Sequence, residues 1–257
     1  MPLLPQEYDV RPVLECIVDG GEIIEYRAEY GRTLICAYAG VGGFSVGVVA
    51  NPKQHIREPG KPFEVGGVIY TESADKAARF IMDCNQNHFP ILFFQDVNGF
   101  MVGRQAEISG IIKSGAKMVN AVANSVVPKI TVIMGGSYGA GNYALCGKAY
   151  DPRLILAWPT CRYAVMGAAQ AARTLTDLRV RQLEKEGNVL DEEGRQQVFS
   201  EIEQKYLREL GPRYGAARLW LDGLIEPHRT REALILALEV ASLRADIEPF
   251  KTGVLQV

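Results

Sequence analysis

The chain has 257 residues, of which 47% are hydrophobic and 23% charged, so it is long enough to bury the core of one large globular domain or two small ones. Its formal net charge of −2 argues against a protein that holds nucleic acid through bulk electrostatics. No apolar run approaches the roughly 20 residues that a membrane-spanning helix needs, so we expect no membrane span.

The first part of the chain predicts a helix, a hairpin and a loop. Residues 10–30 carry apolar side chains at helical spacing, with a break at Asp19-Gly20-Gly21. Residues 33–39 and 44–50 are strand-like runs on either side of a glycine-rich turn, which favours an antiparallel hairpin. Residues 51–65 are polar and contain three prolines, so we expect a surface loop there.

From residue 66 onward, strands and helices alternate. Ser73 is the expected N-cap of a helix that ends before Pro90. The later segments keep this rhythm: the expected strands are 67–70, 91–94, 130–133, 154–157 and 163–166, and the expected helices are 108–123, 168–184, 192–210, 213–221 and 230–246. This alternation predicts an α/β fold with mainly parallel strands. Because no linker divides the chain, we expect a single domain over residues 1–257.

The cysteines and histidines do not suggest a metal site. The five cysteines are widely spaced and form no C-x-x-C pair, and the three histidines lack the spacing of metal ligands. We therefore expect no bound metal, reduced cysteines and a cytoplasmic location.

The most informative stretch joins the strand at 130–133 to a helix through four glycines between residues 135 and 141. A glycine turn between a strand and a helix places several free backbone N–H groups together. Such a place binds phosphate or carboxylate, or stabilises a developing negative charge on oxygen.

Two known motifs overlap this stretch. Residues 139–144 fit the G-x-G-x-x-A pattern of dinucleotide binding, but Asp151 follows too early for the ribose contact expected about 20 residues on. The G-x-S-x-G pattern around Ser137, followed by Asp222 and His228, fits a serine hydrolase. No upstream H-G-G-G-type segment accompanies it to complete an oxyanion hole.

A third function uses the backbone alone. The amides of Ala140 and Gly141 are adjacent, and both residues are small, so a negative oxygen has room to approach them. The alternative is a purely structural role, in which the glycines only allow the helix to pack closely on the strand.

Several longer motifs together resemble one family. They are residues 91–103 (ILFFQDVNGFMVG), 110–118 (GIIKSGAKM), the glycine-rich stretch after 127–129 (VPK), 157–159 (AWP) and 164–167 (AVMG). In this order they resemble the C-terminal half of biotin-dependent acyl-CoA carboxyltransferases. The nearest members are methylcrotonyl-CoA carboxylase β-subunits and the carboxyltransferase subunit of glutaconyl-CoA decarboxylase. The resemblance extends from Tyr8 to Pro227.

The resemblance implies a crotonase-like α/β fold with repeated ββα units. It implies carboxyl transfer between biotin, carried by a partner protein, and an acyl-CoA, with this half on the biotin side. The implied catalytic groups are the amides of Ala140 and Gly141, which would stabilise charge on the ureido oxygen of biotin. The implied substrate-binding residues, each also explicable as simple packing, are Gly139, Tyr143, Phe100 and Met101.

The chain departs from the family in lacking the N-terminal half, which holds CoA in intact members. Either the chain is a separately encoded subunit whose partner supplies this half, or it is a fragment of a longer protein. We expect a partner subunit with the N-terminal half, a biotin carrier protein, and assembly into a homo- or hetero-oligomer. The alternative is a non-catalytic assembly subunit of a carboxylase complex.

Overall fold

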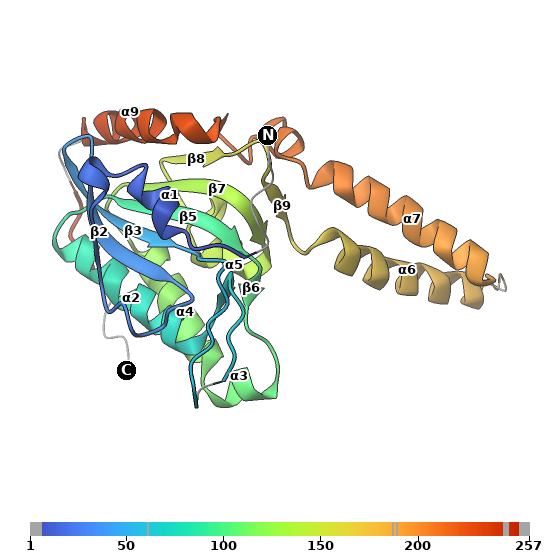
Figure 1. Ribbon diagram of the computed structural model, residues 1–257. Helices are drawn as coiled ribbons and strands as arrows, with labels where there is room; N and C mark the ends of the chain where they lie inside the picture. The colour runs from blue at the N-terminus through green and yellow to red at the C-terminus, as the bar shows by residue number, and fades with distance from the viewer. Residues whose placement is uncertain (1–6, 61, 187, 189, 244–246, 252–257) are drawn as a thin grey trace.

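A mixed sheet forms the centre of the computed structural model, which describes residues 7–60, 62–186, 188, 190–243 and 247–251 (Figure 1). Within these residues the sheet has eight strands in the order β1-β2-β3-β5-β7-β8-β10, with β9 paired to β7. Their bounds are Ile23–Glu25 (β1), Ile35–Val41 (β2), Phe44–Ala50 (β3), Ile91–Val97 (β5), Lys129–Tyr138 (β7), Leu154–Ala157 (β8), Arg162–Ala164 (β9) and Gly223–Leu224 (β10). Strand β2 pairs antiparallel with β1 and with β3, and the other pairings are parallel.

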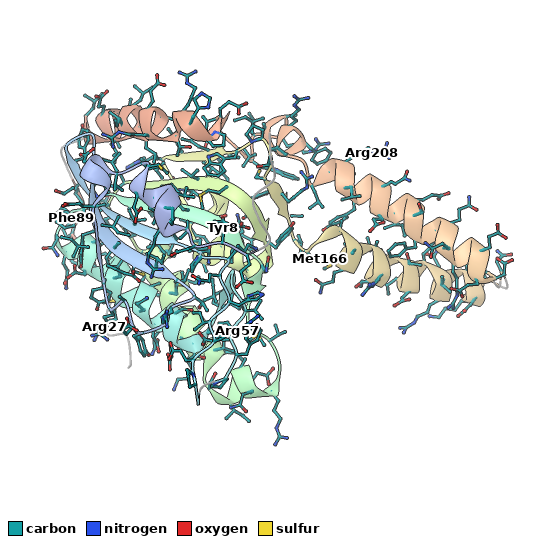
Figure 2. The ribbon with its side chains drawn as sticks, viewed as in Figure 1. Tyr8, Arg27, Arg57, Phe89, Met166 and Arg208 are labelled. Carbon is teal, nitrogen blue, oxygen red and sulfur yellow. The ribbon has the colours of Figure 1, made fainter. Side chains whose placement is uncertain are left out.

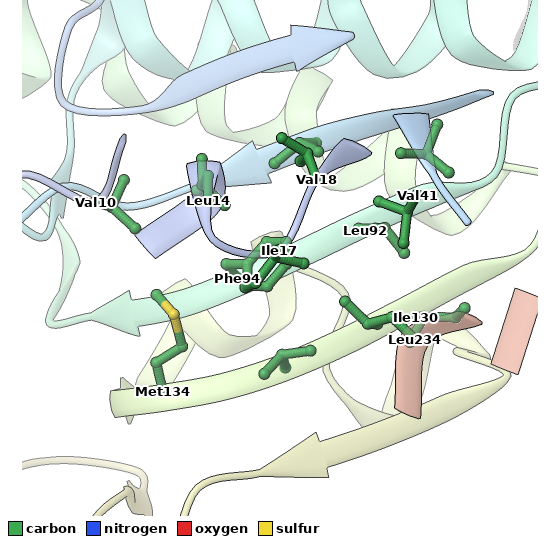
Figure 3. Packing of buried hydrophobic residues seen from close by; sticks show 14 of the residues in the cluster. Val10, Leu14, Ile17, Val18, Val41, Leu92, Phe94, Ile130, Met134 and Leu234 are labelled. Carbon is green, nitrogen blue, oxygen red and sulfur yellow. The ribbon is translucent and has the colours of Figure 1, made fainter. Parts of the chain in front are cut away.

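Helices cover both faces of the sheet, so its central strands are apolar on both sides. One face packs against α1 (Arg11–Glu15) and α9 (Thr230–Ser242), and Figure 3 shows this core. The other face packs against α2 (Thr71–Gln86), α4 (Ile111–Ala123) and α5 (Gly139–Ala144). Each large aliphatic side chain buried in these cores contributes roughly 1.5–3 kcal/mol.

The remaining elements are short, apart from two long helices. A second sheet pairs β4 (Val68–Ile69) with β6 (Gly99–Phe100). The short helical elements are α3 (Arg104–Ile108), α8 (Pro212–Ala216), η1 (Asp19–Gly21), η2 (Lys148–Tyr150) and η3 (Pro227–Arg229). The long helices α6 (Ala168–Lys185) and α7 (Glu192–Glu209) lie side by side and project away from the sheet (Figure 1); we call them the arm. At its base, the Tyr163 N–H donates to the Leu210 carbonyl over 3.1 Å.

Most of the expected elements are present, and several expectations are wrong. The hairpin, the parallel strands and the alternation after residue 66 are confirmed. The helix expected over 10–30 stops at Glu15, and the chain continues through η1 into β1. Ser73 is not the N-cap of α2; it lies in the first turn, where its hydroxyl accepts the Tyr70 N–H over 2.9 Å.

The other corrections concern the glycine stretch and the end of the chain. Gly135 and Gly136 belong to β7, which continues to Tyr138, so the turn is shorter than expected. The helix expected over 213–221 is the single turn of α8. The helix expected over 230–246 ends at Ser242, and residues 244–246 lie outside the described residues.

Asp19 joins the β2–β3 turn to α9. Its carboxylate accepts N–H groups from Gly42 and Gly43, each over 2.9 Å, and pairs with Arg231 over 2.6 Å. The amide of Gly43, the Arg231 guanidinium and the amide of Gly42 lower the pKa of Asp19 from 3.8 to about 2.

This lowered pKa predicts a pH-dependent contribution to stability. Because the folded-state pKa lies below the unfolded value, the contribution is present above pH 4 and is lost as the pH falls through about 2. Asp19→Asn should therefore reduce the free energy of unfolding at neutral pH, and its difference from the parent should shrink towards pH 2. Urea unfolding at several pH values measures this. As a control, Glu232→Gln in an exposed ion pair with Arg229 should change little, and a pH-independent Asp19→Asn effect would contradict the prediction.

Candidate active site

The turn between β7 and α5 creates the exposed backbone that the sequence predicted. Strand β7 ends at Tyr138, and Gly139 begins α5 with φ of +52°, in the left-handed region that favours glycine. The first residues of a helix have no intrahelical acceptor for their N–H groups. Among the hydrogen bonds of the described residues, none uses the amide of Ala140 or Gly141.

A cavity of about 500 Å³ opens beside this turn. Gly139, Ala140, Asn142 and Tyr143 contribute to it from the start of α5. The rest of its lining is mainly aromatic and includes Tyr163, Tyr206, Tyr214 and Trp220. Ala140 is exposed, and the Tyr143 side chain is 48% exposed, so both are accessible to a ligand.

Gly141 does not line this cavity, in contrast to the prediction that both amide-bearing residues face it. The residue is buried, and a Cβ built on it would lie 2.6 Å from Val97 Cγ2 and 3.0 Å from the Cα of Gly99. Glycine is therefore needed at 141 because α5 packs closely on the end of β5 and on β6. Of the predicted pair, Ala140 alone contributes to the cavity lining given by the described residues.

Phe100 and Met101 lie at a different cavity. They line an apolar hollow of about 330 Å³ together with residues of α3 and α4. A Cβ built on Gly115 would lie 3.1 Å from the Phe100 ring, which shows that this ring packs against α4. The structure therefore does not bring Phe100 and Met101 into the cavity that contains Ala140 and Tyr143.

The aromatic wall was not predicted from the sequence. Trp220 contacts the rings of Tyr163 and Tyr214, each with ring centroids 5.9 Å apart. Burial raises the pKa of Tyr163, so its hydroxyl stays protonated at neutral pH. These residues follow β8 or belong to the base of the arm and α8, and no local motif links segments so distant in sequence.

Ser137 is unsuited to be a nucleophile. It is fully buried in β7, where its hydroxyl donates to Gln95 Oε1 over 2.6 Å and accepts from Asn142 Nδ2 over 2.7 Å. Asp222 bonds the Ile155 N–H and Lys148, and His228 is exposed in η3. The serine hydrolase alternative is therefore wrong, because a nucleophilic serine must be accessible and bonded to a base.

A buried ionic cluster lies beneath the end of β7. Asp96 Oδ1 lies 3.1 Å from Lys53 Nζ and accepts the Gly136 N–H over 2.7 Å, while Oδ2 accepts the Tyr8 hydroxyl over 2.9 Å. Figure 2 shows Tyr8 lying against the central sheet. Burial and the Asp96 charge raise the pKa of Tyr8. A Cβ on Gly135 would lie 2.4 Å from Asp96 Cγ, so this carboxylate explains the glycine in the strand.

Comparison with known proteins decides the family. The model of the carboxyl transferase domain matches residues 1–252. The chain belongs to the carboxyl transferase domain family. The resemblance found in the sequence motifs is thus confirmed, and so is the crotonase-like α/β fold. Successive ββα units recur in it, as in β5-β6-α4 and β8-β9-α6.

The relatives of this carboxyl transferase domain include β chains of methylcrotonoyl-CoA carboxylases. The chain is 44% identical over its whole length to the probable mitochondrial β chain of Drosophila melanogaster and covers 42% of that protein. It is 46% identical over 91% of its length to the biotin-dependent 3-methylcrotonyl-coenzyme A carboxylase beta1 subunit of Mycobacterium tuberculosis, covering 42% of it. Among solved structures, the chain is similar to the transcarboxylase 12S subunit, seen as a hexamer, with a TM-score of 0.85 and 32% identity. This match covers 99% of the present chain and 47% of the 12S chain. The chain therefore spans less than half the length of each of these proteins.

The described residues of the carboxyl transferase domain contain neither a metal-ligand cluster nor a membrane-spanning helix. No group of three or more histidine, cysteine, aspartate or glutamate side chains in that part of the chain is placed to hold a metal ion. None of the helices there combines the length and apolar character needed to cross a bilayer. All five cysteines are free thiols, and only Cys16 is exposed.

Proposed function

We propose that this carboxyl transferase domain transfers a carboxyl group between biotin, carried by a partner protein, and an acyl-CoA, and that it supplies the biotin side of the site. The observation that carries the proposal is the cavity beside the start of α5, where the exposed Ala140 meets an aromatic wall. Its volume of about 500 Å³ lies within the range of small-molecule sites, and its apolar lining suits the fused rings of biotin.

Bound biotin would bring the transferable carboxyl group on a ureido nitrogen. In this proposal the Ala140 N–H donates to the ureido oxygen as negative charge develops there. The neighbouring Gly141 N–H, whose residue does not line the cavity, contributes to the positive N-terminal end of α5 and does not bond the oxygen directly. Fixed backbone donors need no proton transfer and no reorganisation at the moment of reaction. Gly139 gives the turn its shape, and Tyr143 and Tyr163 hold the ring system against α5.

We propose a different role for Phe100 and Met101, because they line another cavity. Among the described residues, the lining of their apolar cavity comes from β6, α3, α4 and the segment between β6 and α3, so they do not share a wall with Ala140. We propose that they contact substrate only if the acyl chain extends past β6, and otherwise pack against α4.

The chain covers 42% of each of the two β subunits compared above, so it corresponds to one part of those proteins. We propose that residues 1–257 form one domain of the C-terminal type. The CoA side would come from a subunit with the N-terminal half, and biotin from a carrier protein, in a homo- or hetero-oligomer. Five free thiols fit a reducing compartment, and we propose the cytoplasm.

Reconstitution tests the proposal. The purified chain, a biotinylated carrier and the N-terminal-half subunit that copurifies from the native source should together transfer carboxyl groups to acyl-CoA. The chain with free biotin and acyl-CoA should show no turnover near the roughly 1–10³ s⁻¹ typical of enzymes. Turnover by the chain alone would refute the need for a partner. A stable complete complex without transfer would favour a non-catalytic assembly subunit.

A further inference from the structure

A buried amide side chain ties α5 to the sheet. Gln95 on β5 is fully buried, and its Nε2 donates to the carbonyl of Leu145 over 2.7 Å and to that of Asn142 over 3.4 Å. Its Oε1 accepts the Ser137 hydroxyl over 2.6 Å and Asn142 Nδ2 over 3.3 Å. Gln95 therefore contacts β7 and α5 at once, and all of these atoms are inside the protein.

The bonds to Asn142 and Leu145 lie in the C-terminal half of α5 and at the residue that follows it. The last carbonyls of a helix have no intrahelical donor, and α5 has only six residues to hold its own direction. Gln95 Nε2 donates hydrogen bonds to the carbonyls of Asn142 and Leu145, and the Thr131 hydroxyl donates to the carbonyl of Cys146 over 2.8 Å. The C-terminal end of α5 is thus fixed by side chains from β5 and β7.

The strand register places Gln95 for this role. Gln95 pairs with Ile133 and Val97 with Ser137, so β7 advances four residues while β5 advances two. This bulge brings Ser137 next to Gln95. Because successive residues of a strand point to opposite faces, Gln95 reaches α5 while Asp96 holds Gly136 on the other face. Two neighbouring residues of β5 therefore fix both sides of the segment that leads into the cavity.

We infer that Gln95 is a positioning residue for the carboxyl transfer reaction. It does not line the cavity; it fixes α5, the segment that presents Gly139, Ala140 and Tyr143 to it. The inference rests on the proposed function only in that α5 contacts the reacting groups. We call the four hydrogen bonds of the Gln95 amide the clamp. The clamp is a property of the chain itself, so its effect on α5 can be measured without any substrate.

The test compares two buried amides of the same kind. Gln95→Met keeps the length of the side chain but removes every hydrogen bond of the clamp. The control is Asn85→Leu, because Asn85 is equally buried but bonds Ile81, Ser125 and Val126, away from α5. Both variants should lower the urea midpoint of unfolding, since each leaves buried polar groups without partners. Two further measurements then separate positioning from stability.

The first is amide hydrogen exchange across residues 139–145 of the folded chain. It should accelerate in Gln95→Met and stay at the parental rate in Asn85→Leu. The second is transfer by the reconstituted complex at a temperature where both variants are folded. Gln95→Met should lower kcat by about tenfold to a hundredfold with little change in KM for acyl-CoA, whereas Asn85→Leu should leave kcat unchanged. Gln95→Glu, which still accepts from Ser137 and Asn142, should lie between parent and Gln95→Met.

Each failure has its own meaning. Parental exchange across α5 in Gln95→Met would overturn the inference. Faster exchange with parental kcat would leave the clamp in place and overturn the role proposed for α5 in transfer. An equal loss of kcat in Asn85→Leu would show that Gln95 acts through general stability, which also overturns the inference.

Discussion

Replacing Ala140 with proline should lower the rate of carboxyl transfer by about 10²- to 10³-fold, the loss seen when one preorganised oxyanion donor is removed. Proline lacks a backbone N–H, so the change deletes the proposed donor and adds no charge to the cavity. Proline is tolerated in the first turn of a helix, where the N–H has no intrahelical partner. Ala140 is the second residue of α5, so the helix should persist. Steady-state transfer by the reconstituted complex measures the effect.

The matched control is Ala140→Gly, which keeps the N–H and removes only the exposed methyl group. It should transfer at close to the parental rate, and both variants should unfold near the parental urea concentration. A folded Ala140→Pro variant with parental transfer would mean that this amide does not stabilise charge in the reaction. It would also favour the assembly-subunit alternative. Gly141→Val is a poorer test, because its side chain would clash with Val97 and Gly99 and disturb the fold itself.

The glycines show what the sequence could and could not predict. Their number between 135 and 141 indicated close backbone approach, and the structure has it at three of the four. The sequence did not indicate which groups lie against these glycines. The Asp96 carboxylate lies against Gly135, and Val97 at the end of β5 lies against Gly141. The sequence had suggested that glycine at 141 leaves room for a ligand oxygen. In the structure it leaves room for Val97 and Gly99. A local pattern indicates that a side chain is excluded, but at Gly135 and Gly141 the excluding atom comes from a segment more than 35 residues away.

The same limit explains the cavity wall and the first helix. The strand-to-helix turn was predictable because its signal is local, whereas Tyr206, Tyr214 and Trp220 reach the cavity only because the arm folds back at Leu210. Most residues of the arm are exposed, as its high content of charged side chains suggests. The apolar spacing at 10–18 predicted a long helix, but η1 and its left-handed Gly20 end it early. The apolar residues there are still buried in the core, so burial was predicted better than conformation.

Replacing Asp96 with leucine should lower the free energy of unfolding by about 3–5 kcal/mol, the loss typical when one partner of a buried ion pair is removed. Leucine has a similar shape, so the effect would come from the lost acceptors. The Lys53 ammonium, whose side chain is only 13% exposed, would lose its counter-charge and keep its hydrogen bond to Asn98. The Gly136 N–H and the Tyr8 hydroxyl would lose their acceptor at the same time. Urea unfolding at neutral pH measures the difference.

Two companion variants identify which loss dominates. Asp96→Asn retains one acceptor oxygen, which can serve the Gly136 N–H, and its amide nitrogen can donate to the Tyr8 hydroxyl oxygen, so it should cost less than Asp96→Leu, in the range of about 1–3 kcal/mol. If the unpaired ammonium is the main cost, then Lys53→Met combined with Asp96→Leu should recover much of the stability, because no charge is left buried alone. If the double variant is no more stable than Asp96→Leu, the lost bonds to Gly136 and Tyr8 dominate. A parental unfolding midpoint in Asp96→Leu would contradict the prediction, because it would mean that this cluster does not hold β7 to β5.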